Sequence, residues 1–232
     1  MPSQIPNLEQ QRQLVAEIAL KIRQSLELPE ILQTCVTELR MVLNGDRLLI
    51  YQFQPDWSGL IVAESLGVGI ESALGNRIED SCFQKWRDLT LRAEEPIIAN
   101  DIYAMGYTPC HLQLLEQYGV TANLVQPIYV DEKLWGLIIA HHCSGVREWQ
   151  PTAGLLLKEL SVQLAIAIRQ SNLITSLNQE IKDRKQLEQE LNKIQTQYEK
   201  AQKLAQIGHW EQDLQSNNLY WSPQVFEILE VD

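Results

Sequence analysis

The chain has 232 residues, of which 45% are apolar and 21% charged, and these ordinary globular values exclude a fibrous or fully disordered protein. Thirty acidic and 19 basic residues give a net charge of −11, which would repel a phosphate backbone, so we expect no nucleic-acid partner. The longest apolar run, residues 134–140, is much shorter than the ~20 residues that cross a bilayer. The first residues also lack the apolar core of a signal peptide. We therefore expect a cytoplasmic protein without a membrane span.

The first 150 residues predict an α+β domain with a central antiparallel sheet flanked by helices. Apolar residues recur at helical spacing on both sides of Pro29, which predicts two helices within residues 8–44. Further helices are expected where a polar N-cap is followed by a helical pattern, and strands where β-branched and aromatic residues gather. The expected helices cover residues 82–91 and 109–115, and the expected strands cover residues 47–53, 60–66, 122–130 and 133–143.

Residues 155–207 contain no Gly or Pro over 53 positions and predict a long helix. Part of it carries apolar residues at alternating steps of four and three, as in the seam of a parallel coiled-coil dimer. The seam residues are Leu187, Leu191, Ile194, Tyr198, Ala201 and Ala205. Upstream, the apolar residues Ile174, Leu177 and Ile181 follow the same spacing in a different heptad phase. This suggests that the heptad repeat changes phase near Arg184. A solitary solvated helix remains the alternative.

Beyond this helix the sequence predicts a β-hairpin. Residues 207–214 and 219–221 have strand character, and Asn217-Asn218 between them is typical of a turn. We interpret residues 205–232 as the first part of another domain.

Disulfides are rare in the cytoplasm, so we expect the four cysteines to be buried packing residues, ligands or nucleophiles. Cys82 and Cys110 each stand at the start of a predicted helix, where free N–H groups and the helix dipole favour a thiolate. A small buried packing residue is the alternative for both, and we interpret Cys35 and Cys143 in that way.

The sequence gives little evidence for a zinc site, a protease site or a phosphate-binding loop. The cysteines and histidines match no common zinc spacing, because no pair with the C-x₂-C spacing is present. A Cys–His protease needs spatial partners that the sequence does not reveal, and neither standard Gly-rich phosphate loop is found.

Six short stretches spread over the first domain form the most specific pattern. They are Asp46–Phe53, Pro55–Gly59, Asp101–Tyr103, Pro109–His111, Ala122–Val125 and Leu134–His141. Together they resemble the bilin-binding GAF domains of cyanobacteriochromes, the phytochrome-related photoreceptors. Asp80-Ser81-Cys82-Phe83 matches the Asp-Xaa-Cys-Phe signature of a two-cysteine subfamily, and the resemblance covers residues 10–175.

The resemblance extends to the remaining segments and gives three expected parts. Residues 8–172 would be a bilin-binding GAF domain, and residues 173–204 resemble the signalling helices that precede histidine kinases or cyclases. Residues 205–232 resemble the beginning of a PAS domain.

The resemblance also implies roles for individual residues. Cys110 would bind ring A of a linear tetrapyrrole through a permanent thioether, and Cys82 would add reversibly to the central methine bridge. Asp80 would accept hydrogen bonds from pyrrole N–H groups, His111 would pack on the bilin, and His141 would approach ring D. The aromatic walls of the pocket would include Phe83, Trp57, Tyr103, Tyr107 and Trp135.

From this we expect a photoreceptor module without catalytic activity of its own. It would carry phycocyanobilin or its isomer phycoviolobilin and convert between a violet- or blue-absorbing form and a longer-wavelength form. As a parallel homodimer, it would control a kinase or cyclase output domain in the same protein. The open alternatives are a GAF domain without a chromophore that mediates dimerisation or binds another small ligand, and a thiol redox sensor.

Overall fold

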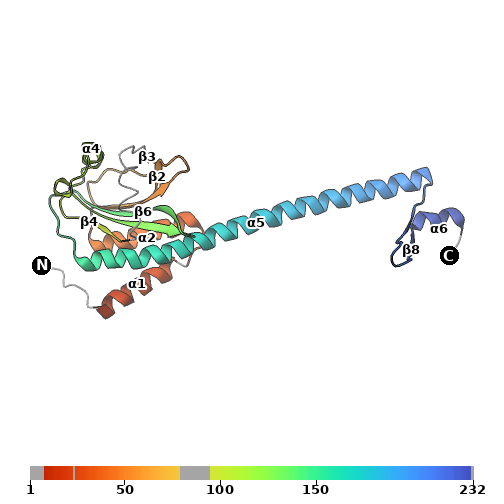
Figure 1. The fold of residues 1–232 in the computed structure, drawn as a ribbon, viewed down its shortest axis with the longest axis horizontal. Helices are drawn as coiled ribbons and strands as arrows, with labels where there is room; N and C mark the ends of the chain where they lie inside the picture. The colour runs from red at the N-terminus through yellow and green to blue at the C-terminus, as the bar shows by residue number, and fades with distance from the viewer. Residues whose placement is uncertain (1–7, 23, 79–94, 231–232) are drawn as a thin grey trace. The chain divides into compact units, whose positions relative to one another are not determined.

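The computed structural model describes residues 8–22, 24–78 and 95–230 (Figure 1). They fall into two compact units, Met1–Ile174 and Thr175–Asp232. The helix predicted for residues 82–91 lies outside the described residues, and so do Asp80, Cys82 and Phe83.

Within the described residues, six antiparallel strands form the sheet of the first unit, in the order β3-β2-β1-β6-β5-β4. Their bounds confirm the four longer strands that the sequence predicts and add two short ones. The strands are β1 (Arg47–Phe53), β2 (Gly59–Leu66), β3 (Arg77–Ile78), β4 (Ile97–Ala99), β5 (Ala122–Val130) and β6 (Lys133–His142).

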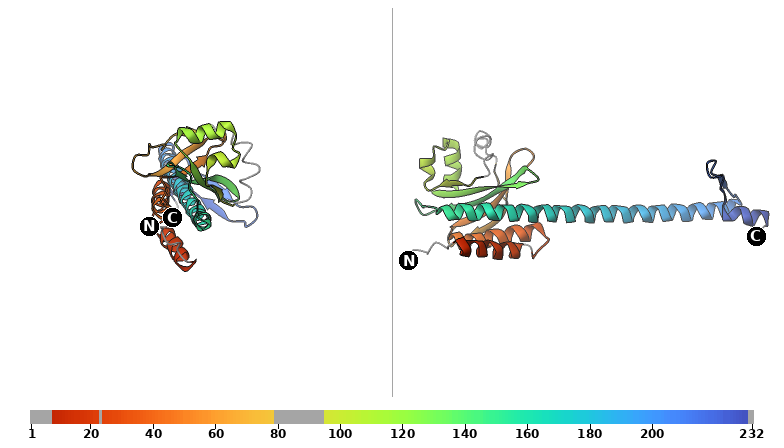
Figure 2. Two further views of the ribbon diagram at one scale, coloured as in Figure 1. Left: turned by 90° about the vertical axis from the view of Figure 1, so that its left-hand side faces the viewer. Right: turned by 60° about the horizontal axis from the view of Figure 1, so that its bottom comes forward.

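Helices cover both faces of this sheet, as the predicted α+β class requires. On one face lie α1 (Leu8–Ile22), α2 (Leu28–Leu43) and the first turns of α5 (Pro151–Ala205). Over the other face lies α4 (Pro109–Gln117), preceded by the short 3-10 helix η2 (Ile102–Met105) (Figure 2).

Strand alternation divides the apolar residues between the two faces, because successive side chains point to opposite sides of a sheet. The register pairs Ile50 with Ile138, and both pack on the side of α1, α2 and α5. It also pairs Leu49 with Ile139, and this row belongs to the face covered by α4. The main core therefore lies on the first face, and the second face is left for a cavity.

Helix α5 is continuous over 55 residues, close to the predicted bounds. Its first turns bury Leu157, Leu160 and Leu164 in the core of the first unit. By length and composition alone it holds an 18-residue window apolar enough to cross a membrane, and 44% of that window is buried. Because the core helix of a soluble domain passes the same test, this is weak evidence for a membrane span.

The second unit contains the rest of α5, the hairpin β7 (Trp210–Gln212) and β8 (Leu219–Trp221), and α6 (Pro223–Leu229). The hairpin that the sequence predicts is therefore present. Its register pairs Trp210 with Trp221, and Gln202 on α5 hydrogen-bonds the Nδ1 atom of His209 at 2.9 Å.

The seam residues Leu187, Leu191, Ile194 and Tyr198 of α5 are all exposed, and so is Leu177. A single heptad phase connects Leu177 with Leu187 when Glu180 and Arg184 occupy the two intermediate seam positions. The phase change suggested near Arg184 stays a prediction, and a single seam interrupted by these two charged residues is the alternative.

Candidate ligand-binding site

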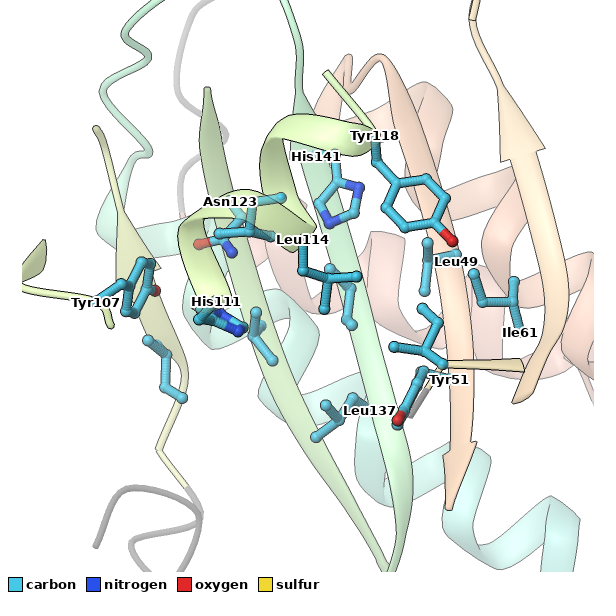
Figure 3. A pocket seen from close by; sticks show the side chains of 15 residues that line it. Leu49, Tyr51, Ile61, Tyr107, His111, Leu114, Tyr118, Asn123, Leu137 and His141 are labelled. Atoms are coloured by element: carbon cyan, nitrogen blue, oxygen red, sulfur yellow. The ribbon is translucent and has the colours of Figure 1, made fainter. Parts of the chain in front are cut away.

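A pocket that is partly open to solvent lies between the sheet and α4. Apolar side chains with a few polar groups among them line it, as is typical of small-molecule and cofactor sites. Figure 3 shows the cavity from close by. Its lining consists of Leu49, Tyr51, Ile61, Ile78, Ile97, Tyr107, His111, Leu114, Leu115, Tyr118, Asn123, Val125, Leu137, Ile139 and His141.

The floor of the cavity is the odd-numbered face of β1, β5 and β6. Leu49 and Tyr51 come from β1, and Leu137 and Ile139 lie opposite them on β6. A Cβ atom at Gly59 would collide with the ring of Tyr51, so this glycine leaves the space that the ring occupies. The largely apolar floor suits a ligand with an extended apolar skeleton.

Helix α4 supplies the roof, and its start is fixed by local sequence. The Thr108 side chain accepts a hydrogen bond from the His111 backbone N–H at 3.3 Å, and Pro109 occupies the first helical position. His111 therefore stands in the first turn. Its ring meets Tyr107 edge-on, with centroids 4.8 Å apart, and both residues line the cavity.

Cys110 precedes His111 in the same turn and is exposed. It is disulfide-bonded in this structure, whereas Cys35 and Cys143 are free. Cys35 is fully buried, and burial raises the pKa of its thiol to about 12, which fits a packing residue. Burial also raises the pKa of Cys143.

The buried polar side chains of the cavity are uncharged near neutral pH. Burial, assisted by the charge of Arg47, lowers the pKa of His141 to about 3. Burial raises the pKa of Tyr107 to about 12, against the opposing effect of a hydrogen bond from Asn123. The cavity therefore presents a neutral imidazole, a neutral phenol and an amide.

A buried ion pair closes one end of the cavity floor. The Nε atom of Arg47 lies 3.1 Å from the Oε1 atom of Glu64, and the two side chains are only 3% and 2% exposed. Arg47 also donates to the backbone carbonyls of Tyr118 at 3.1 Å and Glu71 at 2.8 Å. Glu64 accepts from the Ser72 hydroxyl at 2.7 Å and from the backbone N–H groups of Ala73 and Leu74. The pair thus ties β1 and β2 to the loop after β2 and to the end of α4.

The structure brings some of the sequence-predicted site residues together. His111, His141 and Tyr107 all line the cavity. Tyr103 is 58% exposed on η2, where its hydroxyl donates to Glu116 at 3.0 Å, and it is not part of the lining. Trp57 is 46% exposed in the β1–β2 turn beside Phe53 and also lies outside the lining. Trp135 packs against the core on the opposite face of the sheet.

Sequence reasoning did not single out three polar residues that the fold places at this site. The sequence signal for Arg47 and Glu64 is a charged residue within a largely apolar strand. The signal for Asn123 is an amide inside a buried strand. Charge or amide groups at inward positions signal buried partners or a ligand.

The GAF domain family model matches residues 27–168, more than half of the chain. The circadian input-output histidine kinase CikA of Thermosynechococcus vestitus (strain NIES-2133 / IAM M-273 / BP-1) is 38% identical over 193 residues. That match covers 78% of this chain and 26% of the kinase. The chain spans 18% to 26% of the length of three curated relatives that it matches.

Solved structures with the same fold include two photoreceptor domains. A phycocyanobilin-bound GAF domain from a cyanobacterial phytochrome is 32% identical, with a TM-score of 0.64, and the match covers 70% of this chain and 96% of that one. The blue-light-absorbing form of the Thermosynechococcus elongatus PixJ GAF domain is also 32% identical. Its TM-score is 0.58, and the match covers 69% and 95% of the two chains.

Proposed function

The chain belongs to the GAF domain family and is a sensory module rather than a catalytic domain, and from that premise we propose that it is a photoreceptor that binds a linear tetrapyrrole. One observation carries the proposal: the cavity under α4 is lined mainly by apolar side chains and is bordered by the turn that holds Cys110 and His111. The bilin would be phycocyanobilin or its isomer phycoviolobilin. The apolar floor would contact the rings, and the neutral polar groups would orient them.

In this proposal Cys110 is the permanent anchor. Its thiolate would add to the exocyclic double bond of ring A, so that a C–S bond forms and the displaced π electrons take up a proton. No leaving group or oxidant is needed. The N-terminus of α4 favours the thiolate, and His111, one residue later, reaches the cavity. Because Cys110 is disulfide-bonded in this structure, reduction would have to come first.

Cys82 and Asp80 extend the proposal to residues outside the described part of the chain. Cys82 would add reversibly to the central methine bridge, which divides the conjugated system and gives a violet- or blue-absorbing form. Light would release this bond and produce a longer-wavelength form. Asp80 would accept hydrogen bonds from the pyrrole N–H groups, since a carboxylate is an acceptor only.

The test is co-expression with a phycocyanobilin-producing pathway. We expect a coloured protein with zinc-induced fluorescence on a denaturing gel, and a colourless protein would defeat the proposal. Cys110→Ala should abolish the covalent adduct, while Cys143→Ser, a half-buried cysteine outside the cavity lining, should retain it. Cys82→Ala should remove the short-wavelength form, and an unchanged spectrum would disprove the second linkage.

The helix and hairpin after the GAF domain would carry the signal to an output domain. The exposed seam of α5 supports a parallel homodimer, and relatives named as histidine kinases support a kinase output, with a cyclase as the other option. We propose that the hairpin begins a PAS domain and that the whole protein works in the cytoplasm.

A second candidate function is a thiol redox sensor, which the disulfide at Cys110 favours. In that case peroxide would form the disulfide, and reductant would break it, equally well in protein that never met a bilin. Non-reducing mass spectrometry of bilin-free protein before and after peroxide distinguishes the two. A chromophore-free GAF domain would respond to neither bilin nor peroxide.

A further inference from the structure

A carboxylate, an imidazole and a hydroxyl lie together where β1 begins and β6 ends, outside the lining of the cavity. The Nδ1 atom of His142 lies 2.8 Å from the Oδ2 atom of Asp46. On the other side of the ring, the Nε2 atom of His142 lies 3.1 Å from the hydroxyl oxygen of Ser144. The three groups therefore follow the order of acid, base and nucleophile that activates a serine on several unrelated folds.

The backbone around Asp46 holds its carboxylate in place. The Asp46 N–H donates to the carbonyl of His141 at 3.0 Å, and the Asp46 carbonyl accepts from the N–H of Gly67 at 2.7 Å. The Oδ2 atom also accepts a hydrogen bond from the backbone N–H of Cys143 at 2.7 Å. A carboxylate oxygen fixed beside Nδ1 favours the tautomer with the proton on that nitrogen, because a bare lone pair would otherwise face the negative charge. The Nε2 lone pair is then directed to Ser144.

The contact between His142 and Asp46 is close but not aligned. The buried Nδ1 atom makes no well-directed hydrogen bond to the described residues, although Oδ2 of Asp46 lies beside it. The hydrogen bonds of a nucleophile and its base are often long or poorly aligned before a substrate binds. A small rotation of the imidazole ring would direct its N–H to the carboxylate.

The turn after β6 fixes the position of the hydroxyl. The Thr121 hydroxyl oxygen lies 2.9 Å from the carbonyl oxygen of His142 and 2.7 Å from that of Gly145, and it accepts a hydrogen bond from the Gly145 N–H at 3.1 Å. Gly145 has a φ of +120°, a conformation that favours glycine. The residues before and after the turn are thus anchored, and Ser144 itself is exposed to a reagent or substrate.

We propose that Ser144 is an acylation site, whose hydroxyl accepts an acyl group from an ester or thioester with a good leaving group. The Ser144 oxygen would attack the carbonyl carbon, and its proton would pass to Nε2 of His142. The bond from that carbon to the leaving group would then break, and the leaving alkoxide or thiolate would take the proton from the imidazolium. Asp46 is the positioning residue, which orients the ring and offsets its positive charge. The acyl group stays on the protein, so this is a modification of the sensory module, independent of bilin binding.

The test uses the full chain without bilin and p-nitrophenyl acetate as the acyl donor, with the acetylated residues located by peptide mass spectrometry. We expect Ser144 to be acetylated. Ser216 is the matched control in the same protein, because it is also exposed but its hydroxyl donates to the carboxylate of Asp213 at 2.6 Å rather than to an imidazole. Ser216 should be acetylated about a hundredfold more slowly, since a positioned general base contributes ~10²–10⁴ to such a rate.

Two variants test the roles of the base and the acid. His142→Gln should lower the rate of acetylation at Ser144 about a hundredfold. Asp46→Asn should also slow it, because the amide can donate to Nδ1 and thereby favours the wrong tautomer. In ¹⁵N-histidine NMR at mildly alkaline pH, Nδ1 of His142 should show a one-bond coupling to hydrogen in the wild type, and Asp46→Asn should move the proton to Nε2. A proton on Nε2 in the wild type would overturn the assignment.

The outcomes are decisive and separate from the proposed function. If Ser144 is acetylated no faster than Ser216, or if His142→Gln leaves the rate unchanged, the acylation site is wrong and the three residues only hold the end of the sheet. If a variant fails to fold, the comparison of Ser144 with Ser216 and the wild-type NMR spectrum still decide. Neither result affects the photoreceptor proposal, because no bilin is present, and a colourless protein after co-expression would leave the acylation site standing.

Discussion

Arg47 and Glu64 form their buried ion pair diagonally across two neighbouring strands. The register places Glu64 opposite Leu49, two residues along β1 from Arg47, so the long arginine side chain reaches past its direct neighbour. Hydrogen bonds from Ser72, Ala73 and Leu74 satisfy the carboxylate, and two backbone carbonyls share the guanidinium. The carboxylate and the terminal nitrogens of the guanidinium are thus hydrogen-bonded, and the pair also contacts His141.

Removal of one partner of this pair should destabilise the first unit strongly. Glu64→Leu would leave the Arg47 charge buried and unpaired, and such a loss typically costs ~3–5 kcal/mol. Urea denaturation followed by tryptophan fluorescence measures the free energy of unfolding. The double variant Arg47→Met with Glu64→Leu should recover part of the loss, because no unpaired charge remains. If Glu64→Leu costs no more free energy of unfolding than a substitution of an exposed glutamate such as Glu148→Leu, the stabilising role of the pair is disproved.

The fold of this chain could be predicted well from its sequence because local patterns and tertiary structure agree. The strand alternation of residues 47–53 and the Thr108-Pro109 helix start each reappear with nearly the expected bounds. Two short strands of the first unit, β3 and β4, were missed, since two or three residues carry no readable period. Their pairing depends on contacts with β2 and β5 that are distant in sequence.

The candidate site was predicted less completely, because part of it is also assembled by pairing between strands that are distant in sequence. His111 and His141 could be identified from their motifs, and the fold places both at the cavity. The place of Arg47 and Asn123 at the site depends on strand register, because each lies opposite His141 on a different neighbouring strand. The sequence of one strand does not reveal which residues lie opposite it on the neighbouring strands.

The stability of the protein should depend on pH through His141. Its pKa is lowered to about 3 in the folded state from an ordinary value near 6.5, so the unfolded chain binds more protons between these limits. The free energy of unfolding should therefore be highest above pH 6.5 and should fall as the pH decreases toward 3. The largest slope from one such group is ~1.4 kcal/mol per pH unit. Denaturation series at several pH values should show a smaller slope in His141→Gln, and parallel curves would contradict the assignment.

Covalent loading should require a reduced Cys110. A thiolate is the nucleophile in thioether formation, and a disulfide sulfur cannot take this role. Protein treated with a phosphine reductant should form the phycocyanobilin adduct, and oxidised protein should remain unlabelled on a denaturing gel. Cys35→Ala serves as the control, because this buried thiol packs in the core on the other face of the sheet and should leave the labelling unchanged. Equal labelling of oxidised and reduced protein would rule out attachment at this cysteine.

Self-association through α5 should be strengthened by Arg184→Leu. Arg184 falls on the seam position between Leu177 and Leu187, and its ion pair with Glu188 is solvent-exposed and contributes little. A leucine at this position would add an apolar layer to the seam and bury its side chain between two copies, which is worth ~1.5–3 kcal/mol. Sedimentation equilibrium should show that the Arg184→Leu variant stays dimeric down to a lower protein concentration than the wild type does. Lys185→Leu, one residue away and off the seam, should leave the dissociation constant near the wild-type value, and equal effects of the two substitutions would exclude the proposed seam.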